Sequence, residues 1–283
     1  MRVVHLIITS LLIVYVALPI PAAADDESPS PAAAAATQAV SPPENLEAKA
    51  VPCVDLQEPA VEKAAADKAY RWQKRTIRVA FLDGSNQLRQ RVADAAKGWE
   101  EPSGLRFEFV TSGPSDIRIS FRHRGHYSYI GTVAERIPNN QHTMNLQFTD
   151  ATDTPEVKMI TLHEFGHALG LIHEHQSPES EIQWNIPAVM DYYQGPPNRW
   201  GPEQVYSNVI EKYKGSQSMR TSGFDRNSIM LYPIDRRFTT NGFSSTWNID
   251  LSATDRAFIR EFYRDVAAVP NQAPWYALAA TGL

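Results

Sequence analysis

The sequence has a single cysteine, Cys53, among its 283 residues. An intrachain disulfide is therefore excluded, and the fold must be stabilised by its core alone. The sequence also lacks a basic stripe, and its net charge of −5 argues against a protein that binds nucleic acid. It shows no internal repeat, and no apolar run beyond residue 24 is long enough to cross a bilayer.

The first 24 residues have the three parts of a secretory signal peptide. Arg2 opens the segment, an apolar run extends from Leu6 to Pro19, and Ala22 to Ala24 offer a small-residue cleavage site. The alternative is a membrane anchor, but the run is short for a span of about 20 residues. We therefore expect a mature protein that is secreted, either extracellular or periplasmic, and not inserted in a membrane.

Composition divides the remaining chain into three parts. Residues 25–69 are rich in alanine, proline and glutamate, which predicts a linker or pro-segment unable to form a core. Residues 70–265 have the length and apolar content of one folded domain. Residues 266–283 show no period and are expected to be a loose tail.

The run from His163 to His173 carries the chemistry of the chain. His163 and His167 stand four residues apart, so on a helix their side chains lie on one face. Two imidazoles placed in this way can converge on one metal ion. His173 can join them only if the helix stops, because ten helical residues would span about 15 Å. Gly170 stands where the turn is needed, since glycine accepts a left-handed conformation.

Three neutral imidazoles leave one position on a zinc ion open for water, the pattern of a catalytic site. Glu164 points about 100° around the helix from His163, so it is poorly placed as a ligand. It can instead reach a metal-bound water and act as the general base. The alternative is a buried helix whose histidines are satisfied by other partners.

The spacing H-E-x-x-H-x-x-G-x-x-H resembles the signature of the metzincin zinc endopeptidases. A downstream methionine turn, residues 228–232 with Met230 in third position, fits the same group. Glu174 directly after the third histidine, and Tyr232 two residues after the methionine, are similar to the astacin family. Ser128–Gly131, His173–His175 and Leu251–Tyr263 extend the similarity over about residues 70–265.

The resemblance implies a zinc endopeptidase with one catalytic ion held by His163, His167 and His173. Met230 is then an apolar floor beneath the metal, and Tyr232 ligates zinc at rest or helps to hold the oxyanion. Glu174 takes a supporting role near the mature N-terminus. The substrate is a protein or peptide, bound in extended form to an edge strand near Thr143–Phe148, and the enzyme is expected to be a monomer.

The chain departs from the family pattern in several ways. Family members typically carry disulfides, whereas this chain cannot form one within itself. Gln176–Pro178 replaces the usual charged extension, and Leu231 stands where histidine is common. The absence of glycine–aspartate nonapeptides argues against the serralysin branch. The chain therefore looks like a distant, disulfide-free member of the astacin-like family.

The fold class expected is α+β. The resemblance implies a twisted, mixed five-stranded sheet with two long helices, followed by an irregular subdomain with the methionine turn and a C-terminal helix. Residue periodicity itself predicts helices over about 85–101, from Thr154 and from Ser252, the last capped by the Ser252 hydroxyl. It predicts strands at 77–81, 105–109, 117–121, 129–134 and 143–148.

Several alternatives stay open at this point. Cys53 is either an ordinary free thiol or an inhibitory thiolate that caps the zinc before activation. Glu174 and His175 are conceivable extra ligands, and His123, His126 and His142 are either surface histidines or a second zinc site. A zinc-bearing protein without turnover is the alternative to an enzyme, but the presence of Glu164 argues against it.

Overall fold

The structure, a computed structural model, describes residues 66, 68–196, 198–213 and 223–267. Cys53, the segment 1–24, nearly all of 25–69 and the tail from 268 onward lie outside the described residues, so the predicted segment boundaries stay predictions. The strands are β1 (Thr76–Phe81), β2 (Arg106–Val110), β3 (Ile117–Ser120), β4 (Tyr127–Ser128) and β5 (Met144–Asn145). The helices are α1 (Asn86–Ala96), α2 (Glu100–Ser103), α3 (Thr154–Ala168), α4 (Ile186–Gln194), α5 (Pro202–Val205) and α6 (Ala253–Ala267).

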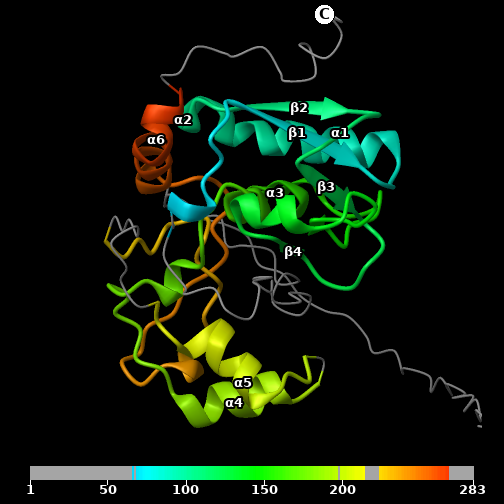
Figure 1. Cartoon of the computed structure of the whole chain (residues 1–283). Coiled ribbons are helices and arrows are strands. Elements are labelled where there is room, and N and C mark those ends of the chain that lie inside the picture. The colour runs from blue at the N-terminus through cyan, green and yellow to red at the C-terminus, as the bar shows by residue number, and fades with distance from the viewer. Residues whose placement is uncertain (1–65, 67, 197, 214–222, 268–283) are drawn as a thin grey trace, which may run out of the picture. The chain divides into compact units, whose positions relative to one another are not determined.

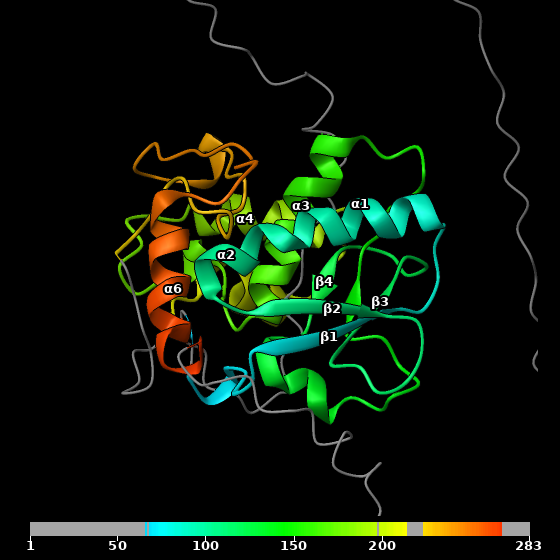
Figure 2. The ribbon, with the colours of Figure 1, turned by 90° about the horizontal axis from the view of Figure 1, so that it is seen from above.

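The five strands form one mixed sheet in the order β2-β1-β3-β5-β4. β1 pairs in parallel with β2 and β3, β3 pairs in parallel with β5, and β4 alone is antiparallel. Helices α1 and α3 pack against each other on one face of the sheet (Figure 2). The α+β class and the mixed five-stranded sheet are as predicted.

One edge of this sheet differs from the sequence-based expectation. The segment expected as the edge strand, Thr143–Phe148, contributes β5, which lies between β3 and β4. The edge on this side is β4, and the predicted strand 129–134 is wrong because Gly131–Arg136 forms a 3₁₀ helix. Ile130, directly before that helix, and Val133 and Ala134 within it are buried, so the buried positions are spaced by three and four residues, as on a helix.

The first helix begins where the sequence predicts, and Ser85 caps it. The Ser85 hydroxyl accepts the Leu88 N–H at 3.1 Å, which satisfies one of the free amides of the first turn. α1 continues through a short 3₁₀ turn into α2, so the predicted segment 85–101 is helical nearly throughout. Trp99 is fully buried and donates its indole N–H to the Leu162 carbonyl of α3 at 2.8 Å.

Helix α3 lies in the centre of the largest hydrophobic cluster. Every residue from Met159 to Ala168 is buried, as the apolar pattern on all sides of this helix predicts. Its C-terminal carbonyls have partners from distant segments. The Trp72 indole donates to the Ala168 carbonyl at 2.7 Å, and the Tyr263 hydroxyl donates to the Leu169 carbonyl at 2.8 Å. These bonds satisfy groups that a helix end leaves without an intrahelical partner.

The chain after α3 builds a second, less regular region around α4 and α5 (Figure 1). It has two small clusters of its own, one around Leu231 and Phe243 and one around Val189 and Val205. Helix α6 then returns to pack against α2. Among the described residues, no helix combines the length and the apolar character that a membrane crossing requires.

Gly166 allows the methionine turn to approach α3 closely. A Cβ at this position would lie 2.3 Å from the Met230 sulfur and 3.3 Å from the Trp99 ring. Both neighbours are buried, so neither can move away at low cost. The glycine is therefore required by packing, although glycine inside a helix costs about 1 kcal/mol relative to alanine.

The loop before β4 holds a histidine in its neutral form. The Nδ1 of His126 accepts the Gln147 N–H at 3.2 Å, and the ring packs on Phe148 with centroids 5.0 Å apart. Burial lowers the pKa of His126 to about 4. Protonation would break the hydrogen bond, because a protonated imidazole has no acceptor.

Replacing Gly166 by alanine should destabilise the protein by about 1–3 kcal/mol, because the new methyl group overlaps the Met230 sulfur. Urea denaturation measures the change. Gly201→Ala is the matched control, since nothing lies within 4 Å of its added Cβ and its φ of −69° suits alanine. Equal stability of the two variants would contradict the packing argument.

Acid should destabilise the protein through His126. The ring has a pKa of about 6.5 when unfolded and about 4 when folded. The stabilisation is thus complete above about pH 6.5 and is lost as the pH falls from there toward 4. Between pH 7.5 and 4.5 the free energy of unfolding of the wild type should fall by about 1–3 kcal/mol more than that of His126→Asn, whose side chain keeps a hydrogen-bond acceptor. His123→Asn, an exposed position in the same loop, should follow the wild type in these denaturation curves. Parallel curves for wild type and His126→Asn would refute the assignment.

Candidate metal centre

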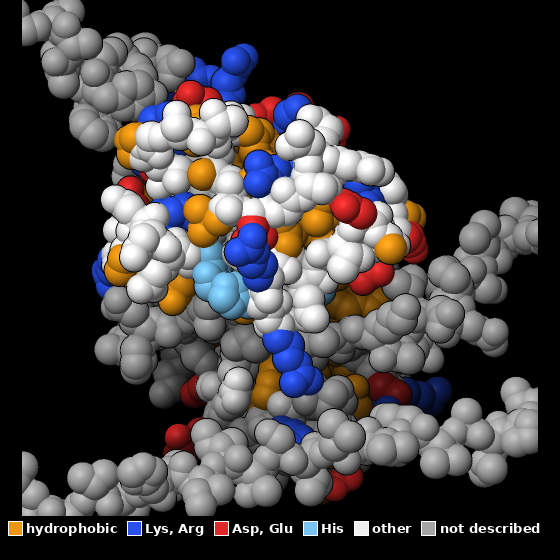
Figure 3. All heavy atoms as spheres, turned by 90° about the vertical axis from the view of Figure 1, so that its right-hand side faces the viewer, with side chains coloured by type: hydrophobic (Ala, Val, Ile, Leu, Met, Phe, Trp, Pro, Cys, Tyr) orange, Lys and Arg blue, Asp and Glu red, His pale blue; other side chains and the backbone are white. Residues whose placement is uncertain are grey.

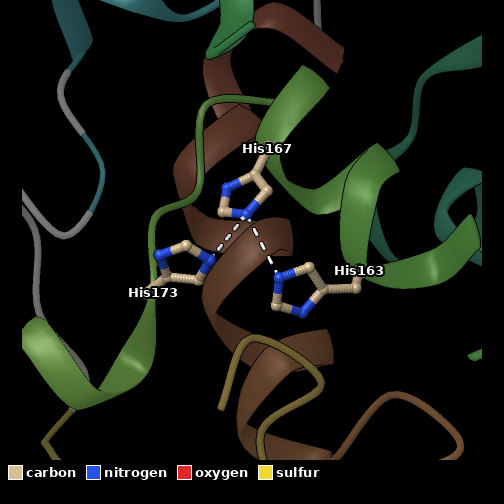
Figure 4. A group of neighbouring side chains, drawn as sticks. All are labelled: His163, His167 and His173. Carbon is tan, nitrogen blue, oxygen red and sulfur yellow. Dashed lines mark hydrogen bonds between the residues drawn. The ribbon is translucent and has the colours of Figure 1, made fainter. Parts of the chain in front are cut away.

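Three histidine side chains meet below the end of α3. His163 and His167 come from α3, and His173 comes from the segment that follows it (Figure 4). The Nε2 atom of His167 lies 3.2 Å from the Nε2 atoms of both His163 and His173. All three side chains are buried. The structure thus brings together the three histidines that the sequence singled out.

The turn that brings His173 back is a Schellman motif at the end of α3. The Gly170 N–H donates to the His167 carbonyl at 2.8 Å, and the Leu171 N–H donates to the Gly166 carbonyl at 3.0 Å. Gly170 has a φ of +94°, the left-handed conformation that its position in the sequence predicts. The helix therefore ends within three residues of His167, and the chain reverses.

Hydrogen bonds to backbone carbonyls orient two of the rings. The Nδ1 of His163 lies 2.7 Å from the Ile229 oxygen, and the Nδ1 of His167 lies 2.9 Å from the Leu171 oxygen. A carbonyl can only accept, so both Nδ1 atoms carry the hydrogen in the neutral rings. The Nε2 atoms then present lone pairs toward each other, an arrangement that is repulsive without a shared cation.

The separation of these nitrogens matches a zinc site. Zn–N bonds of about 2.0–2.1 Å in a tetrahedral arrangement place the nitrogens about 3.3 Å apart, close to the 3.2 Å observed. Imidazole is among the ligands that zinc prefers. Within the described part of the chain, this trio is the one group of three or more side chains able to hold a metal ion. His163, His167 and His173 therefore fit zinc.

The methionine turn lies directly against the trio. Its Ile229 carbonyl accepts from His163, and its Met230 carbonyl accepts the Glu174 N–H at 3.0 Å. The Tyr232 ring is buried beside His173, with centroids 4.2 Å apart, and lies 5.7 Å from that of His163. The structure thus gathers Met230 and Tyr232 around the three histidines.

Glu164 and Glu174 occupy different surroundings. Glu164 is fully buried and precedes His167 by three residues on α3, which places the two on neighbouring positions of the helix surface. The Glu174 carboxylate accepts the Asp225 N–H at 2.7 Å. Burial raises the pKa of Glu174 to about 7, and the nearby Asp255 and Asp225 add to the effect.

The sequence raised His175 as a possible extra ligand, but it did not indicate that this ring packs against Tyr232 and His173. Its ring lies 4.9 Å from that of Tyr232 and 5.2 Å from that of His173, and its Nε2 lies 3.1 Å from the Asn208 oxygen. It packs beside the trio and is outside the metal-binding group. The direction of the His175 ring is set by the 3₁₀ turn Glu174–Gln176. Its position two residues after His173 in the sequence therefore did not indicate this packing.

Three further histidines among the described residues, His123, His126 and His142, lie near β4. Histidine side chains appear there beside lysine or arginine side chains (Figure 3). His123 is exposed and stacks on His142 with centroids 4.2 Å apart, and the Tyr127 hydroxyl lies 2.8 Å from His142 Nε2. None of these three belongs to the metal-binding group, which supports their interpretation as surface or loop histidines rather than a second zinc site.

Known proteins resemble this chain in sequence and in structure. The family model for Astacin, a family of peptidases, matches residues 64–257. A solved structure of myroilysin is 40% identical, covers 70% of this chain and 97% of that chain, and superposes with a TM-score of 0.67. A second myroilysin crystal structure is 38% identical, covers 75% of this chain and 90% of that chain, and has a TM-score of 0.56.

Curated relatives match over shorter stretches. Zinc metalloproteinase nas-38 of Caenorhabditis elegans is 30% identical over 52% of this chain and 17% of its own length. Stromelysin-3 of Rattus norvegicus is 31% identical over 57% of this chain and 37% of its own length. The chain thus spans well under half of these relatives. Together with the family match and the three-histidine cluster, these similarities lead to one conclusion: the chain belongs to the astacin family of zinc metalloendopeptidases, whose members use one catalytic zinc ion.

Proposed function

We propose that the chain hydrolyses peptide bonds with one zinc ion held by His163, His167 and His173 and with Glu164 as the general base. The observation that carries this proposal is that the Nε2 atom of His167 lies 3.2 Å from those of both His163 and His173, while the rings of His163 and His167 are anchored through Nδ1. When bound, zinc supplies a Lewis acid that lowers the pKa of a water to about 7 and polarises a carbonyl.

The protein's own groups handle the proton and the developing charge. Glu164 takes a proton from the attacking water and passes it to the leaving amine. Its complete burial in a rigid helix supports this role, because a fixed carboxylate needs no reorganisation during the reaction. Tyr232, packed against His173, is placed to help hold the oxyanion, and Met230 gives the site an apolar floor.

The substrate is proposed to be an extended peptide that pairs with β4. The Tyr129 N–H donates to the Thr143 carbonyl at 3.0 Å, toward the inside of the sheet. Amides alternate in direction along an antiparallel strand, so the N–H and C=O of Ser128 point away from β5, although the residue is 1% exposed in this structure. An extended peptide can add there as a further strand. This replaces the edge expected at Thr143–Phe148, which the structure places inside the sheet.

Export is also part of the proposal. The signal-like residues 1–24 support secretion to the extracellular space or the periplasm, with removal of that segment. The role of residues 25–69 as a pro-segment and the monomeric state stay predictions.

The Glu164→Gln variant tests the proposed base. It should bind zinc as the wild type does, while the rate of casein hydrolysis falls about 10²–10⁴-fold because proton transfer is lost. The chelator 1,10-phenanthroline should abolish wild-type activity. Glu156→Gln, in the first turn of the same helix, is the matched control and should retain activity. Wild-type rates for Glu164→Gln would show that another group is the base.

Peptides methylated at single backbone nitrogens test the pairing with β4. Methylation at the residue that donates to the Ser128 carbonyl should lower kcat/KM about two- to tenfold, the effect of one lost hydrogen bond. Methylation at its immediate neighbours should have much less effect, since their N–H groups point away from β4. A loss that is equal at successive positions, or absent at all of them, would argue against strand addition.

A further inference from the structure

Asp255 makes more contacts than a helix cap needs. It lies in the first turn of α6, is 7% exposed, and accepts three hydrogen bonds. One comes from the Ser252 N–H at 2.9 Å, while the Ser252 hydroxyl accepts the Asp255 N–H at 2.9 Å, a reciprocal capping box. The other two come from the Ser228 hydroxyl at 2.7 Å and the Ile229 N–H at 2.8 Å, both in the methionine turn.

Through these two bonds Asp255 holds the backbone amides of Ile229 and Met230, which lie on either side of the Ile229 Cα. The Ile229 N–H is bound by the carboxylate directly. The Ser228 hydroxyl donates to Asp255 and also accepts the Met230 N–H at 3.1 Å, so it links the carboxylate to the next amide. With both amides fixed, the direction of the Ile229 carbonyl is also fixed.

That carbonyl accepts from Nδ1 of His163 at 2.7 Å. A continuous path therefore runs from Asp255 through Ile229 to one of the three converging rings. Partners of this kind set the tautomer and orientation of a ligating imidazole, and their removal weakens metal binding about 10–100-fold in proteins.

The burial of Asp255 favours a role beyond capping. A capping carboxylate functions well when it is exposed to water, whereas burying it is costly. Burial raises the pKa of Asp255 although three hydrogen bonds to the carboxylate lower it. The carboxylate thus stays in an unfavourable environment, where it reaches the methionine turn.

We propose that Asp255 is a positioning residue of the zinc centre, which it serves by fixing the Ile229 carbonyl that orients His163. This inference rests on the proposed three-histidine zinc site. It links the N-terminus of α6 to a ligand that lies 92 positions earlier in the chain (255 − 163).

The Asp255→Asn variant tests this role. An amide nitrogen replaces one oxygen, so the side chain can no longer accept all three hydrogen bonds. We expect zinc affinity, measured by competition with a chromogenic chelator, to fall about 10–100-fold. The visible absorption bands of the cobalt-substituted protein should shift, because the ligand geometry changes. Turnover should fall mainly in kcat, since no substrate contact is removed.

Ser252→Ala is the matched control, because it removes the hydroxyl cap of α6 but keeps both bonds from Asp255 to the methionine turn. It should lower the melting temperature and leave zinc affinity and the cobalt spectrum unchanged. Asp255→Asn could instead show a lower melting temperature together with wild-type zinc affinity and cobalt bands. Asp255 would then only cap α6, and the proposal would be overturned.

Ser228→Ala decides the matter if Asp255→Asn does not fold. It breaks the link from Asp255 to the Met230 N–H, and it should weaken zinc binding and shift the cobalt bands in the same direction. Unchanged values in this variant would also overturn the proposal. A wild-type protein that binds no zinc would instead refute the metal centre itself, so the two failures are distinguishable.

Discussion

The whole structure depends on holding three imidazole nitrogens about one point in a buried site. The Nε2 atom of His167 lies 3.2 Å from those of His163 and His173, and the lone pairs of these nitrogens repel in the absence of a positive charge. In a buried, low-dielectric site this repulsion is large. The scaffold must therefore be rigid enough to keep the rings in place. When a zinc ion binds, the same lone pairs coordinate it, and the interaction becomes attractive.

That rigidity comes from segments far apart in the sequence. Trp99 holds the middle of α3 through the Leu162 carbonyl, while Trp72 and Tyr263 hold its end through the Ala168 and Leu169 carbonyls. The methionine turn supports the same helix from another side. Its sulfur occupies the space left by Gly166, and its backbone binds a ligand ring. Each support satisfies a polar group or fills a gap, so rigidity and core packing have the same source.

Expectations that rested on local chemistry were confirmed. The Ser252 cap, the left-handed Gly170 and the buried α3 all depend on residues within one or two helical turns. Expectations about the sheet edge were partly wrong. β4 and β5 are only two residues long, too short for alternation to show which residues pair. The strand expected at 129–134 became a 3₁₀ helix, because spacing of three and two cannot be separated over six residues.

The sequence by itself determined the metal chemistry: the ligand types, their spacing, the glycine that ends the helix, and Glu164 beside them. These features are local, so a short window contains all the necessary geometry. Only the tertiary structure decided that β4, and not the segment of β5, lies at the edge of the sheet. It also decided that Ile229 orients His163 and that Asp255 reaches the methionine turn. Such contacts join residues tens of positions apart, and their geometry follows from how helices and turns pack, which no local pattern records.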